Sequence, residues 1–545
     1  MILFLAFVLA QEVDLDALTL AGGAKRTSAG LEFTGPGQAA EGPSPKVDGI
    51  EAMTVAVWVK PLRRGEQLFV HRGTPETAPS GDRLFRPQPD WVNFVLGTDE
   101  RGFLMGTIHG NGRMPFIFVT LNEVPTHGWS RLVLVKDAAG FQHFYMNGAL
   151  VCSDREAAAA GVVRPFRDTA PGEPLRVSVP LGGSVRGVSI VPRALSPEEI
   201  RRDAEGAPPP PAPVELRDID LKPRPDLWPE PVTARSWPGH RERILRGMRE
   251  IFGDGPSEKL PPDPKVLSEE DRGTYVRRKV SIQVQADDRM PAWLLIPKKR
   301  ASRVPAVVCF YGTTRGQGKD TTVGLTGEKN RGFAVDMVEA GFVALAPDYL
   351  RDGERVRPGR KPYDSTDFYA AFPDWSIHGK DTWDTMRAID YLQSLDVVDP
   401  DRIGMVGHSY GGHSTIFTAA VEPRIKAAWA NGPVSDFVQH GMHWATPKGG
   451  GSSQSLPAMR PYLLEGRRPP ITFYEVTALI APRALVVGQA VGERRPMEEE
   501  NHAAVKAVYE ALGVPARVRY VWYPGDHDFP PHVRRAAVDF FKREL

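Results

Sequence analysis

Residues 403–412 read Ile403-Gly404-Met405-Val406-Gly407-His408-Ser409-Tyr410-Gly411-Gly412. Within this stretch, Gly407 to Gly411 match G-x-S-x-G, a motif that sets a serine on a sharp turn between a strand and a helix. The pentapeptide alone is a weak signal, but its context fits. An apolar strand is predicted directly before it, and residues 412–421 are compatible with a helix. The pattern predicts that Ser409 is an exposed nucleophile.

The sequence on both sides of this turn alternates apolar runs with helical stretches. The runs that predict strands are 306–310, 342–346, 403–406, 484–487 and 517–522. Alternation of this kind requires crossover connections and therefore a mainly parallel sheet. The second half of the chain is predicted to be an α/β domain.

The first half of the chain has a different pattern. Its β-branched and aromatic runs are short, and Gly, Pro, Asn and Asp separate them, as in an all-β sandwich. These runs are 54–59, 116–119, 131–135 and 141–146. Between the two halves lies Gly206-Ala207-Pro208-Pro209-Pro210-Pro211-Ala212-Pro213, and consecutive prolines form a stiff, extended spacer.

These patterns divide the chain into a signal peptide (1–10), a sandwich (11–205), a proline-rich linker (206–214) and an α/β domain (215–545). The signal peptide is predicted because residues 2–10 are apolar and end in Val8-Leu9-Ala10, although no Lys or Arg precedes them. A buried first strand is the alternative. The run is far shorter than the ~20 residues of a membrane helix. We expect a secreted or periplasmic protein without a membrane span.

Composition excludes several classes of function. The 68 Lys and Arg balance 67 Asp and Glu, leaving a net charge of +1, so the electrostatic footprint of a nucleic-acid binder is absent. Two cysteines, Cys152 and Cys309, exclude a disulfide scaffold and a Cys-rich zinc site. A chain of 545 residues can build large cores without such cross-links.

The first half resembles laminin-G-like, concanavalin-A-type domains over roughly residues 15–203. The phrases that carry the resemblance are 53–61 (early strand), 128–135 with 145–148 (central hairpin), and 186–190 with 193–200 (closing strand and terminal helix). The resemblance implies a jelly-roll sandwich that binds glycan or protein, sometimes with calcium. No compact Asp/Asn cluster marks a calcium site. Trp58 and Trp129 could stack on sugars, but their alternating strand positions favour the core.

The second half resembles the α/β-hydrolases over roughly residues 265–545, and more narrowly the dienelactone hydrolase and acetyl-xylan-esterase-like group. The phrases that carry this resemblance are Val397-Val398-Asp399-Pro400-Asp401-Arg402-Ile403-Gly404, Ala346-Pro347-Asp348-Tyr349, Trp383-Asp384 with 388–392, and Ile480-Ala481-Pro482-Arg483-Ala484-Leu485. The resemblance is specific to the fold and much less so to a substrate. It implies a Ser-His-acid triad, an acyl-enzyme intermediate and no cofactor.

His527, in the loop after the last predicted strand, is predicted to be the general base, since hydrolases place the serine, the acid and the histidine in that order. The acid departs from the family, which usually has an Asp after the strand that corresponds to 484–488. Glu493 is the first carboxylate of that loop, and it can orient the imidazole as an Asp does. The alternatives are a surface pair of Glu493 with a neighbouring arginine, and Asp436 as the acid.

The backbone amides of Tyr410 and Thr313 are predicted to form the oxyanion hole. Tyr311 stands where the family commonly has a histidine, and its hydroxyl either faces the substrate or is packed. Trp375 and Trp444 are predicted to line the substrate pocket, because both lie in loops at the carboxyl ends of strands.

A metal site is not expected. His440 and His443 have the spacing of a metal-binding pair, but no third ligand is nearby, so we expect surface histidines.

The predicted function is a secreted serine carboxylesterase. An acyl ester of a polysaccharide is the expected substrate, because a module of a sugar-binding type is attached. One alternative is a serine peptidase of the prolyl-oligopeptidase type, which shares the hydrolase domain but normally carries a propeller. The other is a carbohydrate-binding protein with an inactive hydrolase domain, which the missing Asp keeps open.

Overall fold

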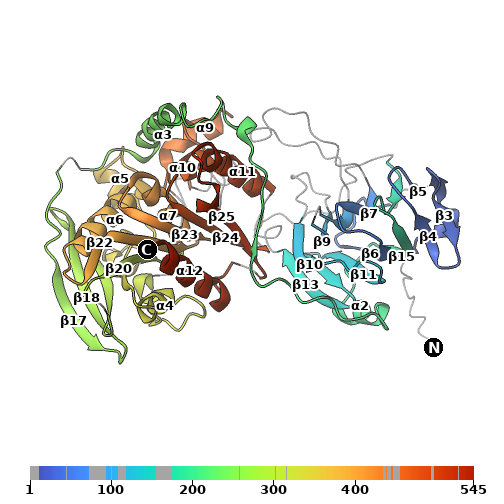
Figure 1. Ribbon diagram of the computed structural model, residues 1–545, viewed down its shortest axis with the longest axis horizontal. Coiled ribbons are helices and arrows are strands. Elements are labelled where there is room, and N and C mark those ends of the chain that lie inside the picture. Colours follow the sequence, from blue (N-terminus) through green and yellow to red (C-terminus); the bar gives the residue numbers. More distant parts are fainter. Residues whose placement is uncertain are drawn as a thin grey trace. The chain divides into compact units, whose positions relative to one another are not determined.

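A computed structural model describes most of the chain. The described residues are 11–43, 46–72, 94–99, 101–108, 118–154, 173–256, 258–300, 302–314, 316–433, 437, 444–445, 454–491, 496–525 and 527–545. The predicted signal peptide, residues 1–10, lies outside them. The chain forms two compact units (Figure 1). The first comprises 1–215, 490–496 and 523–526, and the second comprises 216–489, 497–522 and 527–545.

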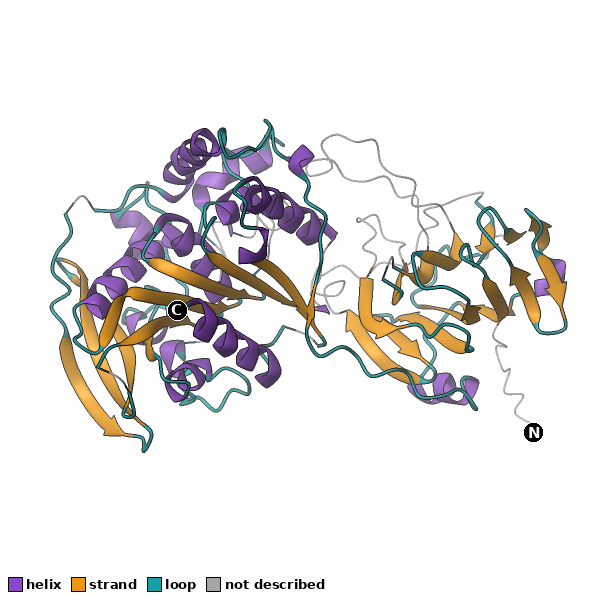
Figure 2. Cartoon of the chain, viewed as in Figure 1, coloured by secondary structure: helices purple, strands orange, loops and turns teal. Residues whose placement is uncertain are grey.

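The first unit is built from two antiparallel sheets (Figure 2). One has the order β13-β12-β11-β6-β15-β4-β3, with β1 paired to β15, and the other has the order β10-β9-β8-β7-β14-β5-β2. The strands of the first sheet are β1 (Gln11–Glu12), β3 (Lys25–Thr27), β4 (Gly30–Phe33), β6 (Met53–Pro61), β11 (Ser130–Lys136), β12 (Gln142–Met146), β13 (Ala149–Asp154) and β15 (Gly183–Val191). Those of the second are β2 (Thr19–Ala21), β5 (Ala39–Gly42), β7 (Gln67–Arg72), β8 (Phe94–Thr98), β9 (Phe103–Ile108), β10 (Phe118–Glu123) and β14 (Leu175–Val177).

Alternation along β6 explains the core of this unit. Val55, Val57 and Val59 are buried in the core cluster, because successive side chains of a strand point to opposite faces. Trp58, between them, is half-buried on the other face, where the guanidinium of Arg186 lies 5.1 Å from its ring. The same guanidinium lies 4.3 Å from the ring of Trp129. The expectation that these tryptophans belong to the core is therefore wrong.

A short helix closes the first unit, as predicted. Helix α2 (Pro197–Asp203) begins with a capping box in which Ser196 and Glu199 satisfy each other's backbone amides. Its buried Ile200 packs on the outer face of the first sheet, against residues such as Val133 and Tyr145.

The second unit is built on one sheet with the order β16-β25-β24-β23-β22-β20-β21-β19-β18-β17. Its strands are β16 (Arg217–Asp218), β17 (Lys265–Asp271), β18 (Tyr275–Gln285), β19 (Asp288–Pro297), β20 (Val304–Phe310), β21 (Val343–Pro347), β22 (Val398–His408), β23 (Ile425–Asn431), β24 (Ala484–Ala490) and β25 (Val518–Tyr523). The central strands from β21 to β24 are parallel, whereas β17, β18, β19 and β16 are antiparallel to their neighbours.

Helices cover both faces of this sheet (Figure 2). They are α3 (Trp237–Phe252), α4 (Phe333–Glu339), α5 (Thr366–Ala371), α6 (Ile377–Gln393), α7 (Tyr410–Val421), α9 (Arg460–Leu464), α10 (Phe473–Ala478), α11 (Pro496–Ala511) and α12 (Pro531–Glu544). Helices α6 and α7 pack together on one face, and α4 and α12 on the other. The predicted sandwich followed by an α/β domain is confirmed. Among the described helices, none has the length and apolar character needed to cross a membrane.

The order of β20, β21 and β22 creates the place for a site. The chain runs from β20 to β21 on one side and returns to β22 on the other side of β20. Loops that leave β20 and β22 at their carboxyl ends therefore diverge, and open α/β sheets bind ligands at such switch points.

The second unit begins with its own edge strand. Arg217 and Asp218 of β16 pair with β25, and the buried Ile219 donates its amide to the carbonyl of Tyr520 at 2.8 Å.

We expect residues 214–545 to fold alone, and residues 222–545 to be less stable because they lack β16. Burial of one isoleucine contributes about 2 kcal/mol, so the shorter fragment should melt at least about 3 °C lower. Thermal melts of the two fragments followed by circular dichroism measure this. Equal melting temperatures would show that β16 adds no stability.

Candidate active site

Ser409 occupies a tight turn between β22 and α7. Its backbone has φ +59° and ψ −120°, an unusual conformation for a residue with a side chain. The turn fits because Gly411 has no side chain: a Cβ there would lie 2.2 Å from the carbonyl oxygen of Phe310. The Ser409 amide donates to the carbonyl of Asn431 at 2.8 Å. The side chain of Ser409 is half-buried at the carboxyl end of the sheet.

The loop after β20 lies against this turn. A Cβ added to Gly312 would lie only 2.8 Å from the Cβ of Ser409, so only glycine allows the approach. Most amides further along the loop donate to protein oxygens, namely those of Thr314, Gly316, Gly318 and Lys319. By contrast, the amides of Thr313 and Tyr410 donate to no protein oxygen within the described part of the chain. Two unused donors therefore flank Ser409.

His527 lies in the exposed loop between β25 and α12. Its ring centroid is 4.6 Å from that of His408, the residue before Ser409. The loop is held by Asn431, whose Nδ2 donates to the carbonyl of Asp528 at 3.0 Å. Arg331 forms an ion pair with the Asp528 carboxylate at 2.5 Å. The loop that carries His527 thus comes to the turn that carries Ser409.

His408 is buried between these parts. Burial lowers the pKa of His408 well below its usual value, and the neighbouring His527 and Arg331 lower it further. Its Nδ1 lies 3.1 Å from Nδ2 of Asn431, and a neutral ring can accept this hydrogen bond. We therefore expect the His408 ring to be neutral and to pack between the serine turn and the histidine loop, not to act as a second base.

Four residues singled out in the sequence lie outside the described residues: Glu493, Asp436, His440 and His443. Glu493 belongs to the connection between β24 and α11.

Tyr311 is buried, and its hydroxyl is occupied. The hydroxyl accepts from the amide of Tyr349 at 2.9 Å and lies 3.4 Å from Oδ1 of Asp348. Of the two interpretations of this residue, these contacts favour packing over contact with substrate.

Both predicted pocket tryptophans are buried. Trp375 is 5% exposed and packs with Phe368 and Ile377. Trp444 is 2% exposed and meets the ring of His413 edge-on at 4.8 Å. These contacts place the two rings in aromatic clusters beneath the surface and favour a supporting role.

The side chain of Tyr410 points into the protein. Its hydroxyl donates to Asp381 at 2.8 Å, and its ring stacks on His378 at 4.8 Å. Burial raises the pKa of Asp381 to about 6, although Arg351 and the Tyr410 hydroxyl oppose this. Sequence reasoning missed Asp381, because an aspartate inside an amphipathic helix is typical of a solvated face.

Sequence reasoning also missed Asn431. Its position directly after the apolar run of β23, at the carboxyl end of the strand, was the available signal. The segment after β21 also carries a feature that the sequence analysis did not predict. A small pocket there is lined by arginines, including Arg351 and Arg360, but Asp364 and Asp367 pair with Arg360.

The strand order, the strained serine turn and the histidine loop together define an α/β-hydrolase domain. Residues 215–536 match the Abhydrolase family over more than half of the chain, and the chain belongs to that family. Residues 34–201 match the Concanavalin A-like lectin/glucanases superfamily. Both resemblances predicted from the sequence are confirmed.

Several known proteins are similar to this chain. YtaP of Bacillus subtilis (strain 168), which carries the provisional name of a hydrolase, is 28% identical over 56% of this chain and 98% of YtaP. A glucuronoyl esterase structure from Solibacter usitatus is 20% identical, with a TM-score of 0.47 over 60% of this chain and 98% of that one. Acetyl Xylan Esterase 1 from Thermoanaerobacterium sp. JW/SL YS485 is 16% identical, with a TM-score of 0.38 over 60% and 96%.

The raised pKa of Asp381 predicts how the stability of the protein depends on pH. A folded-state pKa raised from 3.8 to about 6 favours the folded state at low pH, and this contribution is lost as the pH rises through 6. The isosteric Asp381→Asn stays neutral, so at pH 8 it should be more stable than wild type by up to roughly 3 kcal/mol. The melting-temperature difference between the variant and wild type should therefore widen from pH 4 to pH 8.

Asp288→Asn is the control of opposite sign. Burial raises the pKa of Asp288, but Arg355 and Lys380 outweigh burial and lower it to about 2. This variant should lose stability at pH 8. A constant difference for Asp381→Asn across the range would contradict the assignment of its pKa.

Proposed function

We propose that the protein is a serine ester hydrolase in which Ser409 is the nucleophile and His527 the general base. The observation that carries the proposal is the meeting of three features at one turn. These are the strained Ser409, the unused amides of Thr313 and Tyr410, and the His527 loop held by Asn431.

The chemistry follows from these positions. Oγ of Ser409 attacks the ester carbonyl carbon while His527 accepts the hydroxyl proton. The carbonyl oxygen becomes an oxyanion, which the amides of Thr313 and Tyr410 stabilise. When the C–O bond to the alcohol breaks, the alcohol takes the proton from His527 and an acyl-serine ester remains. Water then attacks the acyl carbon while His527 accepts its proton. The bond between the acyl carbon and Oγ breaks, Oγ takes that proton from His527, and the carboxylic acid leaves.

The acid of the triad is proposed to be Glu493, with Asp436 as the second candidate. A carboxylate beside the second ring nitrogen keeps the imidazole in the tautomer that accepts the serine proton. The support for Glu493 is its place in the chain, three residues after the end of β24, where the family carries its acid.

The proposed substrate is an acyl ester on a polysaccharide. Support comes from the first unit, which belongs by sequence to a superfamily of lectins and glucanases. On its surface Arg186 lies over both Trp58 and Trp129, and half-buried tryptophan rings with an adjacent cation are suited to sugar rings that bear acidic groups. A carbohydrate ligand of this unit is part of the same proposal.

Ser409→Ala should lower turnover of p-nitrophenyl acetate at least ~10³-fold, because the acyl-enzyme can no longer form. A fluorophosphonate probe should label wild type at Ser409 and leave the variant unlabelled. Ser414→Ala, a buried serine on the same helix, is the matched control and should keep its labelling.

Labelling that survives Ser409→Ala would contradict the proposal. Hydrolysis of prolyl peptides in preference to esters would favour a peptidase. A folded wild type without any activity would favour a carbohydrate-binding protein.

Glu493→Gln should lower turnover at least ~10²-fold at neutral pH, because the imidazole loses its orienting charge. Asp436→Asn should change turnover much less. Steady-state kinetics with folding checked by circular dichroism measure both. The reverse ranking would make Asp436 the acid, and no loss in either variant would leave His527 without the proposed partner.

A further inference from the structure

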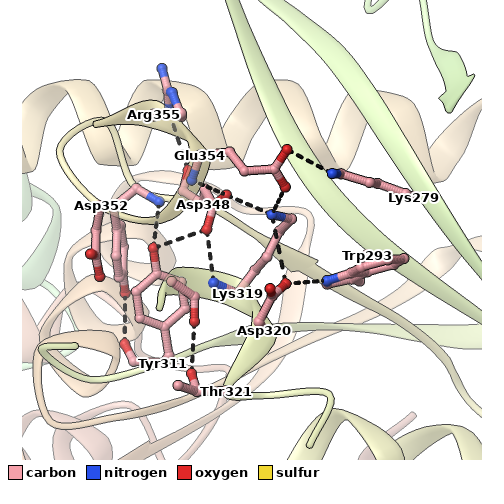
Figure 3. Close-up of polar contacts among 12 residues, drawn as sticks. Lys279, Trp293, Tyr311, Lys319, Asp320, Thr321, Asp348, Asp352, Glu354 and Arg355 are labelled. Carbon is pink, nitrogen blue, oxygen red and sulfur yellow. Dashed lines mark hydrogen bonds and ion pairs between the residues drawn. The ribbon is translucent and has the colours of Figure 1, made fainter. Parts of the chain in front are cut away.

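The loop that carries Thr313 is held on both sides of this residue. Two buried aspartates of the segment after β21, Asp348 and Asp352, provide the contacts. Asp348 reaches Tyr311, two residues before Thr313, and Asp352 reaches Thr314, one residue after it. Figure 3 shows both carboxylates together with Tyr311.

On the first side, the carboxylate of Asp348 is enclosed by Lys319 and by the backbone of Gly353, which together form a cage. Its Oδ2 accepts from Nζ of Lys319 at 2.8 Å and its Oδ1 from the Lys319 amide at 2.8 Å. The cage is closed by backbone, since a Cβ on Gly353 would lie 2.2 Å from Oδ1. Burial lowers the pKa of Lys319, but Asp348 and Glu354 outweigh it and raise the pKa, so the lysine stays charged.

On the second side, Asp352 holds Thr314 in two ways. The Thr314 hydroxyl donates to Oδ2 of Asp352, which also accepts from the Tyr363 hydroxyl at 2.8 Å. The Tyr363 oxygen in turn accepts from the Thr314 amide at 2.5 Å. Oδ1 of Asp352 accepts from the Gly316 amide at 2.9 Å. Both the amide and the side chain of Thr314 are thus tied, which fixes the peptide plane next to Thr313.

We infer that Tyr363, Asp352 and Thr314 are positioning residues that set the direction of the Thr313 amide. The inference rests on the proposed function, in which that amide stabilises the oxyanion. An oxyanion donor contributes only when it is aimed at the place where charge develops in the transition state. The ground-state carbonyl carries little of that charge. Loosening Thr314 should therefore lower kcat and leave KM nearly unchanged.

A merely structural role makes a different prediction, and the chain offers a matched comparison. Tyr369 lies on the same segment, and its hydroxyl also accepts from a backbone amide, that of Ile377 at 3.3 Å. It donates to the carbonyl of Gln454. None of these partners belongs to the loop of Thr313. Loss of a hydroxyl at either tyrosine removes similar hydrogen bonds, but only Tyr363 is joined to the oxyanion loop.

The test compares Tyr363→Phe and Tyr369→Phe in the full chain. Tyr363→Phe should lower kcat for p-nitrophenyl acetate about 10-fold or more, with KM within about 2-fold, because one aimed donor is typically worth 10²–10³ in kcat. The affinity for a methyl trifluoromethyl ketone, which forms the tetrahedral adduct, should fall in parallel. Tyr369→Phe should keep kcat within about 2-fold of wild type.

Thr314 supplies a second pair in case Tyr363→Phe fails to fold. Thr314→Val removes the hydroxyl at constant shape and should lower kcat, and Thr314→Ser should restore most of the loss. Equal kcat for the two tyrosine variants, or for the two Thr314 variants, would overturn the inference. Full activity in Ser409→Ala would overturn the proposed function and this inference with it, whereas an inactive Ser409→Ala with unaffected Tyr363→Phe would overturn only the inference.

Discussion

The hydrogen bonds of Asn431 are the constraint on which the rest of the site depends. Its carbonyl accepts from the Ser409 amide, and its side chain donates to the carbonyl of Asp528. One residue at the end of β23 thus joins the serine turn to a histidine loop that lies almost 120 residues further along the chain. The register of the sheet makes this possible, because His408 and Asn431 are direct partners between β22 and β23. Parallel pairing brings both strand ends to one edge, where loops meet.

Sequence patterns predicted the parts of this arrangement that are local or periodic. The short β-branched and aromatic runs of the first half and the alternation of apolar runs with helical stretches in the second half predicted both folds, and G-x-S-x-G predicted the turn at Ser409. The contacts of Asn431, Asp352 and Tyr363 could not be predicted, since they join residues whose separation in the sequence carries no periodic signal. Trp375 and Trp444 show the same limit. Their position after strands places them near the correct edge, but only the packing shows that they point inward.

Charge is distributed unevenly around the proposed site. His408 and His378 are buried, and burial lowers the pKa of both well below the usual value, so neither carries charge at neutral pH. Buried ion pairs lie behind the loop of Thr313, where Lys319 meets Asp348, and at α6, where Arg355 meets Asp384. Closer to Ser409, the ring of His408 is neutral, whereas Arg331 forms an ion pair with Asp528 of the histidine loop. In the proposed mechanism, the amides of Thr313 and Tyr410 stabilise the oxyanion.

The contact between Asp348 and Tyr311 suggests what the buried Lys319–Asp348 ion pair does in the structure. Burying an ion pair costs desolvation that the mutual attraction only partly offsets, so stability alone is a weak reason to keep one. A carboxylate fixed by Lys319 and by backbone amides is, however, a rigid acceptor, and the Tyr311 hydroxyl lies 3.4 Å from it. The family commonly has a histidine where this chain has Tyr311. In the proposed mechanism a backbone amide meets the oxyanion, so the side chain at this position can serve as an inward anchor. The Tyr311 hydroxyl reaches Asp348, and this contact ties the start of the Thr313 loop to the segment after β21.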